Sequence, residues 1–454
     1  MTLRALAKPA LVAFLALFLF IPVGWIQGLV HERQLRSAYT VAGIAEGWGK
    51  RQALAGPYLA LPYEHTEVRI VHETVDGKPR ERRTEHTTAK VLRISAEAVE
   101  WRIGVDVSEK ARGIYKARLY GAKLEVRGRL IVPPRFGLAP DTPTSRTRTH
   151  APRLVVGISD PQGIRAVSPL SANDARLAFQ PGPGDANVPG GLHVPLPDLR
   201  ATQTLEFAFT LELAGSEALA VSPLGADTTV SMRSGWPHPS FAGRFLPLKH
   251  DIRPDGFTSE WKISRYAAPG TTPGHELSVG FVEPAGLYQR LERASKYGFL
   301  FIGLTFAAFM LCELLRRLAI HPIQYALVGL ALAMFFLLLV ALSEHIAFTA
   351  AYAIATFACV GLISGYLVRV LHSPRLGLTF GAALASLYAM LYALLQAEDY
   401  ALLGGALLLF ALLAAIMTAT RRVDWYALGT KNAPRPASTQ ADASWEERRR
   451  PEAA

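Results

Sequence analysis

The sequence predicts a membrane protein whose mainly antiparallel, sandwich-like β domain is inserted between an N-terminal transmembrane helix and a C-terminal bundle of five transmembrane helices. The first observation is hydropathy: an apolar segment at 10–30 precedes the mostly polar region 31–296, and a dense series of apolar segments follows at 297–420. A hydrocarbon core about 30 Å thick is crossed by about 20 helical residues, and these segments reach that length. The second observation is the alternation of apolar and polar residues within 31–296, which is typical of half-buried strands.

The distribution of charge argues against a nucleic-acid partner, although the net charge of +11 would suggest one. Much of the excess lies beside the apolar segments and in the tail, at Arg4, Lys8, Arg316, Arg317, Arg369, Arg375, Arg421, Arg422, Lys431 and Arg448–Arg450. Basic residues are expected there when helix ends face the cytoplasm, so the predicted partner is the lipid bilayer. Both cysteines, Cys312 and Cys359, lie in predicted helices, so region 31–296 must fold without a disulfide.

The first helix is predicted at 10–30, after a short cytoplasmic N-terminus at 1–9. Arg4 and Lys8 precede the apolar run, as basic residues do in a cleaved signal peptide. The run is too long for the apolar core of a signal peptide, and no small-x-small cleavage site ends it. We therefore predict an uncleaved signal anchor, in which Pro22 is a tolerated kink.

Charged residues bound the five later helices. These helices are predicted at 297–315, 322–342, 347–368, 376–396 and 400–420. Their ends are alternately basic, at 316/317, 369/375 and 421/422, and acidic, at 344 and 398/399. Because basic residues mark the cytoplasmic side, this alternation predicts six spans with both termini in the cytoplasm. Region 31–296 then faces the extracytoplasmic space, which in a two-membrane bacterium is the periplasm, and 421–454 is predicted to be a disordered cytoplasmic tail.

The water-facing region is predicted to consist mainly of strands. Apolar side chains recur at every second position through 99–107, 118–132 and 205–213. Turn-forming pairs such as Asp76-Gly77 and Asp255-Gly256 separate runs of this kind. We predict an antiparallel sandwich, and two repeated β-units remain an alternative within it.

Three polar segments of this region do not alternate. The segment 37–51 is predicted to be helical. The segments 80–83 and 135–153 are predicted to be surface loops, and a basic patch for an anionic envelope polymer is the alternative interpretation.

The sequence contains no motif for catalysis or cofactor binding. It lacks a G-x-S-x-G elbow, a Walker A loop, a G-x-G-x-x-G fingerprint and a C-x-x-C pair, and no His-Glu pair has a second histidine at metal-ligand spacing. We therefore predict a protein that is not an enzyme and has no cofactor or metal. The best candidate site of the water-facing region is Ser234–Ser240, because it concentrates Trp236 and His238; a packed corner stiffened by two prolines is the alternative.

The membrane half offers one polar candidate site. Glu344 and His345 end the third predicted helix, and Glu398 and Asp399 end the fifth on the same predicted side. Ionisable residues at membrane depth suggest function, and these four would form a pH-sensitive cluster if the helices pack together. Interfacial caps and topology signals are the alternative interpretation.

Two small-residue motifs predict close helix packing. Gly361 and Gly365 lie near the end of the fourth predicted helix, and Gly377 and Gly381 lie at the start of the fifth. Glycines at this spacing let helix backbones approach each other closely. We predict a tight hairpin between these two helices.

Several long motifs carry a family resemblance. They are KYGFLFIGLTFAAFMLCELLRRLAIHPIQYALVGLALAMFFLLLVALSEHIAF at 296–348, LLQAEDYALLGGALLLFALLAAIMTATRRVDWY at 394–426, AEGWGKRQALAGPYLALPY at 45–63, YKARLYGAKLEVRG at 115–128, GISDPQGIRAVSPL at 157–170 and SGWPHPSFAGRFLP at 234–247. In this order they resemble the CreD family of bacterial inner-membrane proteins. The resemblance implies a location in the inner membrane and a link to envelope integrity. It implies no reaction and no catalytic residue.

Three functions follow as hypotheses. The leading one is a non-enzymatic envelope protein whose periplasmic β domain binds or senses an envelope component or a protein partner. The second is a transporter or channel-like protein that uses Glu344, His345, Glu398 and Asp399. The third is an envelope-modifying enzyme centred on His238.

Overall fold

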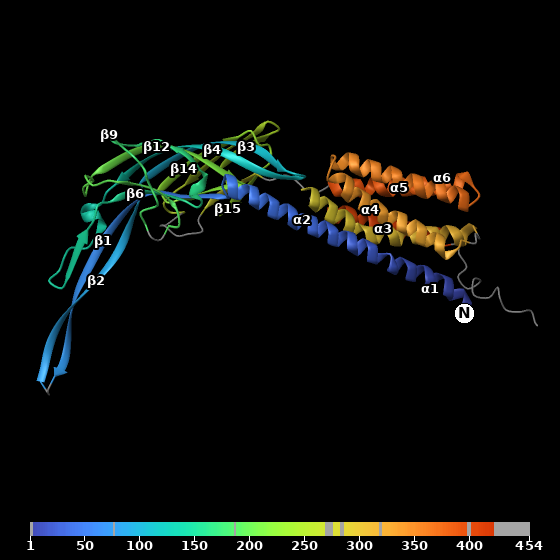
Figure 1. Ribbon diagram of the computed structural model, residues 1–454, viewed down its shortest axis with the longest axis horizontal. Coiled ribbons are helices and arrows are strands. Elements are labelled where there is room, and N and C mark those ends of the chain that lie inside the picture. Colours follow the sequence, from blue (N-terminus) through green and yellow to red (C-terminus); the bar gives the residue numbers. More distant parts are fainter. Residues whose placement is uncertain are drawn as a thin grey trace, which may run out of the picture. The chain divides into compact units, whose positions relative to one another are not determined.

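The computed structural model describes residues 3–75, 78–185, 188–267, 276–281, 286–316, 320–396 and 401–421. The chain divides into two compact units (Figure 1). Met1–Arg33 and Ala285–Ala454 form one, called here the helical unit, and Gln34–Pro284 form the other, called here the β unit.

Seven helices are described, and α2 continues from the helical unit into the β unit. They are α1 (Leu3–Phe18), α2 (Phe20–Trp48), α3 (Leu287–Arg316), α4 (Pro322–Ser343), α5 (Phe348–Val370), α6 (Pro374–Gln396) and α7 (Ala401–Thr420). Among the described residues, four helical segments are long and apolar enough to cross a membrane: Ala10–Trp48, α4, α5 and α6.

The N-terminal helical segment differs from its prediction in length. Pro22 has no N–H to donate to the carbonyl of Phe18, which explains why α1 ends at Phe18 and α2 begins at Phe20. No proline follows within α2, so the part of the predicted segment 10–30 from Phe20 onward and the helix predicted at 37–51 belong to one helix, which ends at Trp48.

Helix α3 begins at Leu287, ahead of the predicted start at 297. Its first turns are amphipathic: Leu291 and Ala294 are each 1% exposed, whereas Lys296 is exposed. A hydropathy average does not detect a helix whose apolar side chains occupy one face only, and the prediction therefore missed these turns.

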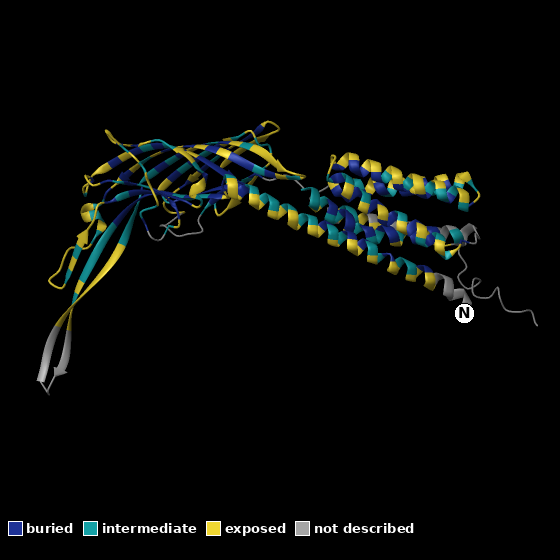
Figure 2. Cartoon of the chain, viewed as in Figure 1, coloured by how far each residue is buried: buried dark blue, intermediate teal, exposed yellow. Residues whose placement is uncertain are grey.

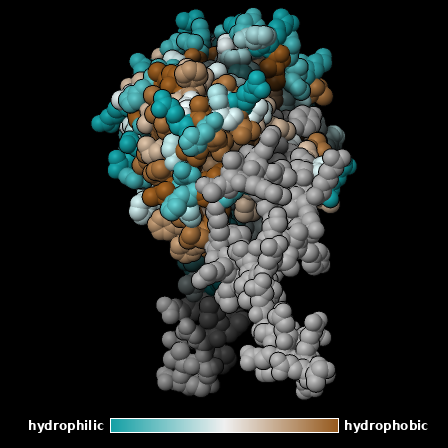
Figure 3. All heavy atoms as spheres, turned by 90° about the vertical axis from the view of Figure 1, so that its right-hand side faces the viewer, coloured by the Kyte–Doolittle hydropathy of each residue, from teal (hydrophilic) through white to brown (hydrophobic). Residues whose placement is uncertain are grey.

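Aromatic side chains dominate the core of the helical unit. The Tyr388 ring lies 4.4 Å from that of Phe335 and 5.3 Å from that of Phe301, measured between centroids. The Tyr352 hydroxyl donates to the Tyr388 carbonyl at 2.7 Å, which satisfies a buried polar group. Buried residues line the inner sides of α3, α4 and α5 in Figure 2. Figure 3 shows hydrophobic and hydrophilic residues side by side on the visible surface.

The strands of the β unit form two nine-stranded sheets. Sheet A contains β1 (Gln52–Val75), β2 (Lys78–Ser95), β5 (Ser145–Thr149), β6 (Arg153–Ile158), β10 (Gln180–Pro181), β11 (Gly191–Pro195), β13 (Ala218–Pro223), β15 (Pro239–Gly243) and β18 (Leu277–Phe281). Sheet B contains β3 (Ala98–Arg112), β4 (Tyr115–Ile131), β7 (Ile164–Val167), β8 (Leu170–Ala172), β9 (Ala175–Leu177), β12 (Thr204–Ser216), β14 (Asp227–Ser234), β16 (Lys249–Arg253) and β17 (Gly256–Ile263).

The inner faces of both sheets share one hydrophobic core, so the β-sheet-rich region is a sandwich. Trp101 of β3 and Trp261 of β17 lie in this core with Leu54 of β1 and Leu219 of β13. The three strands predicted from alternation are present as β3, β4 and β12. The sheets are not wholly antiparallel, because β1 pairs with β13 and β3 pairs with β14 in parallel.

A long hairpin replaces part of the predicted loop structure. β1 and β2 pair without a break from Tyr58↔Ser95 to Val75↔Lys78, so the segment 80–83, predicted as a loop, is a strand. The segment predicted as a loop at 135–153 contains β5, which pairs with β1. Residues 83–90 of β2 are all exposed (Figure 2), and a strand with no buried face shows no apolar alternation.

Candidate functional site

The outer face of sheet B carries the residues that alternate with its buried core positions. In β3, Trp101 and Ile103 are buried, and Gly104 and Asp106 belong to the opposite face. Residues of five adjacent strands stand directly opposite one another in the order Lys123 (β4), Gly104 (β3), Arg233 (β14), Thr258 (β17) and Asp251 (β16). We call this line of residues the Gly104 row.

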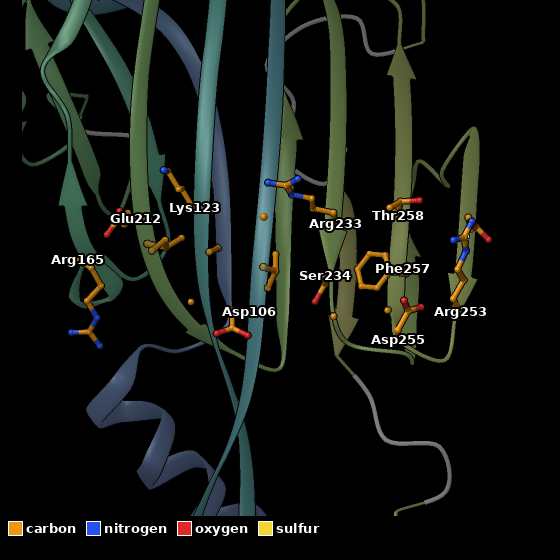
Figure 4. Close-up of a pocket in the computed structure, with 18 residues that line it drawn as sticks. Asp106, Lys123, Arg165, Glu212, Arg233, Ser234, Arg253, Asp255, Phe257 and Thr258 are labelled. Carbon is orange, nitrogen blue, oxygen red and sulfur yellow. Dashed lines mark hydrogen bonds and ion pairs between the residues drawn. The ribbon is translucent and has the colours of Figure 1, made fainter.

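A hollow of about 760 Å³ lies over the Gly104 row (Figure 4). Gly104, Gly121, Gly235 and Gly256 leave its floor without side chains. Its charged lining comprises Lys123, Arg165, Arg233 and Arg253, together with Asp106, Glu212, Asp251 and Asp255. A second hollow of about 700 Å³ shares Gly104, Lys123 and Arg233 with it, so the two adjoin.

At Gly104 and Gly121 the bare floor is not required by packing. A Cβ atom added at Gly121 would have no neighbour within 4 Å, and one at Gly104 would meet only the Arg233 Nε at 3.8 Å. By contrast, a Cβ at Gly128 of the same strand would lie 2.7 Å from the Ala98 carbonyl oxygen. Glycine within a strand costs roughly 0.5–1 kcal/mol relative to alanine, and often marks a place where a ligand approaches the backbone.

Two cations of the hollow, Lys123 and Arg233, have no polar side-chain partner among the described residues. Ion pairs on this face join residues two apart on a strand: Arg102 Nε lies 2.8 Å from Glu100, and Arg253 Nη2 lies 2.6 Å from Asp251. Lys123 and Arg233 make no side-chain hydrogen bond or ion pair with any residue that the structure describes, although Glu212 stands opposite Lys123. In Figure 4, Arg233 leans toward β3 and Lys123 toward β12.

Three of the motifs quoted above converge beside the hollow, where α2 meets sheet B. The Arg165 guanidinium lies 4.8 Å from the Trp48 ring centroid and donates to the Trp48 carbonyl at 2.8 Å. The Trp48 Nε1 donates to the Tyr120 carbonyl at 3.3 Å, and the Lys50 N–H donates to Asp160 at 2.8 Å. These contacts tie the end of α2 to a rim residue of the hollow.

A network of buried hydrogen bonds supports this junction between α2 and sheet B. Gln52 is fully buried and donates through Nε2 to the carbonyls of Asp160 and Ala214, at 3.0 and 3.1 Å. The Tyr120 hydroxyl donates to the Ala218 carbonyl at 2.9 Å. Burial raises the pKa of Tyr120 far above its ordinary value, so its phenol stays neutral as a donor.

A second buried polar group lies at the base of the hairpin. Asp185 accepts from the Tyr58 hydroxyl at 3.0 Å and from the Arg93 Nε at 2.7 Å, and its side chain is 0% exposed. Burial, reinforced by the Asp185 carboxylate, raises the pKa of Tyr58 far above its ordinary value. The three residues hold together β1, β2 and the loop after β10, and we call them the Asp185 triad.

The predicted candidate segment contributes to the hollow, but not through the predicted side chains. Ser234 and Gly235 line it. The Trp236 ring packs against the core and lies under the Arg118 guanidinium, at 5.7 Å, and its Nε1 donates to the His238 carbonyl at 3.1 Å. His238 is exposed and is not part of the lining. Among the described residues, no group of three His, Cys, Asp or Glu side chains has a geometry that would hold a metal ion.

The predicted acidic cluster in the membrane half is described only in part. Glu344 is 8% exposed in its side chain, and its Oε1 lies 3.6 Å from the Nε of Arg33 on α2. His345 is exposed in the turn after α4. Glu398 and Asp399 lie outside the described residues. Arg33 was not predicted as part of this site, because it lies beyond the predicted end of the first helix at residue 30.

The glycine motifs pack differently from the prediction. α5 and α6 approach closely, and a Cβ at Gly377 would lie 2.7 Å from the Val368 backbone nitrogen, while one at Gly381 would collide with Ser364. Gly361 and Gly365 face open space, with nothing within 4 Å of an added Cβ. Ser364 and Val368, each three residues after one of these glycines and about 60° around the helix from it, make the contact instead, so the predicted role of Gly361 and Gly365 is wrong.

Comparison with known proteins now assigns the family. The family model described as "Inner membrane protein CreD" matches residues 4–426. The chain belongs to the CreD family. Inner membrane protein CreD of Escherichia coli (strain K12) is 35% identical over 426 residues, which cover 90% of this chain and 91% of that protein. This CreD-family chain is thus an inner membrane protein, with several apolar helices and a β-sheet-rich unit.

Similarity to solved structures is weak. An M1 zinc metallopeptidase from Deinococcus radiodurans shares 12% identity at a TM-score of 0.21, over 45% of this chain and 53% of that chain. The chain therefore spans about half the length of that protein. Leukotriene A4 hydrolase from Saccharomyces cerevisiae shares 10% identity at a TM-score of 0.21, over 47% and 35% of the two chains. Scores this low carry no argument about activity.

Proposed function

We propose that this CreD-family protein supports envelope integrity without catalysing a reaction, and that its β unit binds an envelope component in the hollow on sheet B. The observation that carries the proposal is the combination of a glycine floor with cations that lack carboxylate partners. Open space over Gly121 and Gly104 costs stability and serves no packing purpose. Charged side chains of both signs around an open hollow suit a hydrophilic ligand.

Filling the hollow is expected to abolish retention of the ligand. In Gly121→Tyr, the side chain enters space in which an added Cβ meets nothing within 4 Å, so the strand pairing is preserved. Full-length protein, immobilised in mild detergent, would be incubated with solubilised bacterial envelope, and the retained molecules identified by mass spectrometry. We expect a component that is retained by the wild-type protein and lost, by at least tenfold, in Gly121→Tyr.

Thr229→Tyr is the matched control for this measurement. Thr229 lies four residues before Arg233 on β14, in register with Glu100 and outside the lining of both hollows. The control should retain the component as the wild type does. Equal retention by all three proteins would refute the hollow as the binding site.

We also propose the six-span topology, with both termini in the cytoplasm and the β unit in the periplasm. It is supported by the alternation of basic and acidic helix borders, and by the four helical segments long enough to span a bilayer.

Cysteine labelling tests this topology. Thr229→Cys in the β unit should react with a membrane-impermeant maleimide in intact spheroplasts, whereas Ser373→Cys, between α5 and α6, should react only after lysis. The wild type is the control, because its two cysteines lie in the apolar helices α3 and α5. The opposite pattern of labelling would reverse the proposed orientation.

A further inference from the structure

Two cations on the outer face of sheet B flank a position that has no side chain of its own. Lys123 and Arg233 stand on either side of Gly104, one strand away in each direction. Neighbouring strands are about 4.8 Å apart, so the two Cα atoms are separated by about 10 Å. Gly104 contributes no side chain between them, and the Arg233 side chain extends over it (Figure 4), with its Nε 3.8 Å from a Cβ added at Gly104. Both side chains are exposed and long enough to reach a group placed over Gly104.

Neither cation pairs with a carboxylate of the described residues. Like charges on one sheet face repel, and three other cations of this face, Arg102, Arg253 and Lys262, each pair with a carboxylate two residues away. The same-face neighbours of Arg233 on its own strand are Ser231 and Gly235, which carry no charge. Glu212 and Glu125 are the carboxylates nearest to Lys123 in register and sequence, and neither comes within ion-pair distance.

One carboxylate stands beside this position. Asp106 is two residues beyond Gly104 on β3, about 7 Å along the strand, and pairs in register with Gly121. Its side chain has no hydrogen-bond donor among the described residues. A ligand that places an anion over Gly104 would therefore present a hydroxyl or amine to Asp106, as a sugar ring that carries an acidic substituent does.

Resting on the proposed function, we infer that the bound envelope component is an acidic saccharide. Its phosphate or carboxylate lies over Gly104 between Lys123 and Arg233, and a neighbouring hydroxyl or amine donates to Asp106. Charge-assisted hydrogen bonds from both cations supply the affinity, and the glycine floor lets the ring approach the sheet. The two hollows adjoin across the strands, so further sugar units of a chain extend into the second.

The inference is tested by calorimetric titration of the full-length protein in nanodiscs. The probes are phosphorylated mannan oligosaccharide, oligogalacturonate and a neutral dextran oligosaccharide of matched length. We expect at least one acidic probe to bind tenfold or more tightly than dextran, and the preferred probe distinguishes phosphate from carboxylate. Lys123→Gln and Arg233→Gln should each weaken that binding about tenfold, because each removes one charge-assisted hydrogen bond.

Two further variants make the test specific. Arg127→Gln removes a cation from the same face of β4, outside both hollows, and should leave the affinity unchanged. Gly104→Glu places a carboxylate between the two cations, where an added Cβ has room. It should raise the melting temperature at low salt and abolish binding of the acidic probe, because the protein then supplies its own anion.

The outcomes separate this inference from the proposed function. Equal binding of acidic and neutral probes, or equal effects of Arg127→Gln and Arg233→Gln, would overturn the acidic saccharide. Lys123-dependent binding to phosphatidylglycerol vesicles, without binding to the oligosaccharides, would also overturn the acidic saccharide as the ligand. If Gly121→Tyr still loses the envelope component in these cases, the hollow remains the binding site. If Gly121→Tyr retains the envelope component as the wild type does, the proposed function itself is refuted.

Discussion

Replacing Asp185 with alanine is expected to lower the free energy of unfolding of the β unit by about 3–5 kcal/mol. The carboxylate is 0% exposed, and it accepts from Arg93 at 2.7 Å and from Tyr58 at 3.0 Å. Its removal leaves a guanidinium, only 23% exposed, without its carboxylate, and a buried hydroxyl without its acceptor. Both groups lose their hydration in the folded state, so the loss exceeds that of an ordinary hydrogen bond.

Chemical denaturation of the full-length protein in detergent measures this effect. Trp101 and Trp261 are buried in the core of the β unit and contribute the tryptophan fluorescence signal of its unfolding. Asp227→Ala is the matched control, because it breaks an exposed ion pair with Arg265, at 3.6 Å, and should cost less than about 1 kcal/mol. A loss no larger for Asp185→Ala than for Asp227→Ala would show that the Asp185 triad does not hold the hairpin base.

The substitution Gly377→Ala is expected to destabilise the helical unit by about 1–3 kcal/mol. The new Cβ would lie 2.7 Å from the backbone nitrogen of Val368 and 2.8 Å from its Cα. Backbone atoms cannot rotate aside, so α5 and α6 must separate. The thiol of Cys359 on α5 is 5% exposed, and its reaction with a thiol-reactive dye during heating reports this unfolding in a Cys312→Ser background.

Gly361→Ala provides the control on the same pair of helices. An added Cβ there meets nothing within 4 Å, and alanine has a better helix propensity than glycine by about 1 kcal/mol. The melting temperature should therefore stay unchanged or rise. If Gly361→Ala and Gly377→Ala melt alike, the close approach of α5 and α6 is absent in the membrane protein.

Much of the β unit was predictable because its strands have one buried face. The alternation at 99–107, 118–132 and 205–213 identified β3, β4 and β12, and it also placed Gly104, Asp106 and Lys123 on the polar face. These residues were not predicted as a site, because charged and glycine positions on a solvated face look alike in a single sequence. The signal that was available was the glycine at an outward position between two charged residues of β3, Arg102 and Asp106.

The candidate site in the membrane half was less predictable. Glu344 was found from its position at a helix border, but its partner Arg33 comes from a turn of α2 beyond the apolar segment. The glycine spacing indicated that α5 and α6 pack closely, yet the spacing alone does not say which face of α5 meets Gly377. Ser364 and Val368 form that face, and neither belongs to the motif.

The sequence by itself determined the membrane location, the insertion of a β domain between apolar segments, the alternating charged borders and the family. These properties depend on composition and period along the chain, which burial in lipid or in a sheet imposes locally. Only the tertiary structure decided which strands are neighbours. The parallel pairing of β3 with β14 brings Arg233 beside Gly104, although the two residues are far apart in sequence. Which strands pair with each other depends on packing in the shared core of the whole sandwich, and no local sequence pattern encodes that choice.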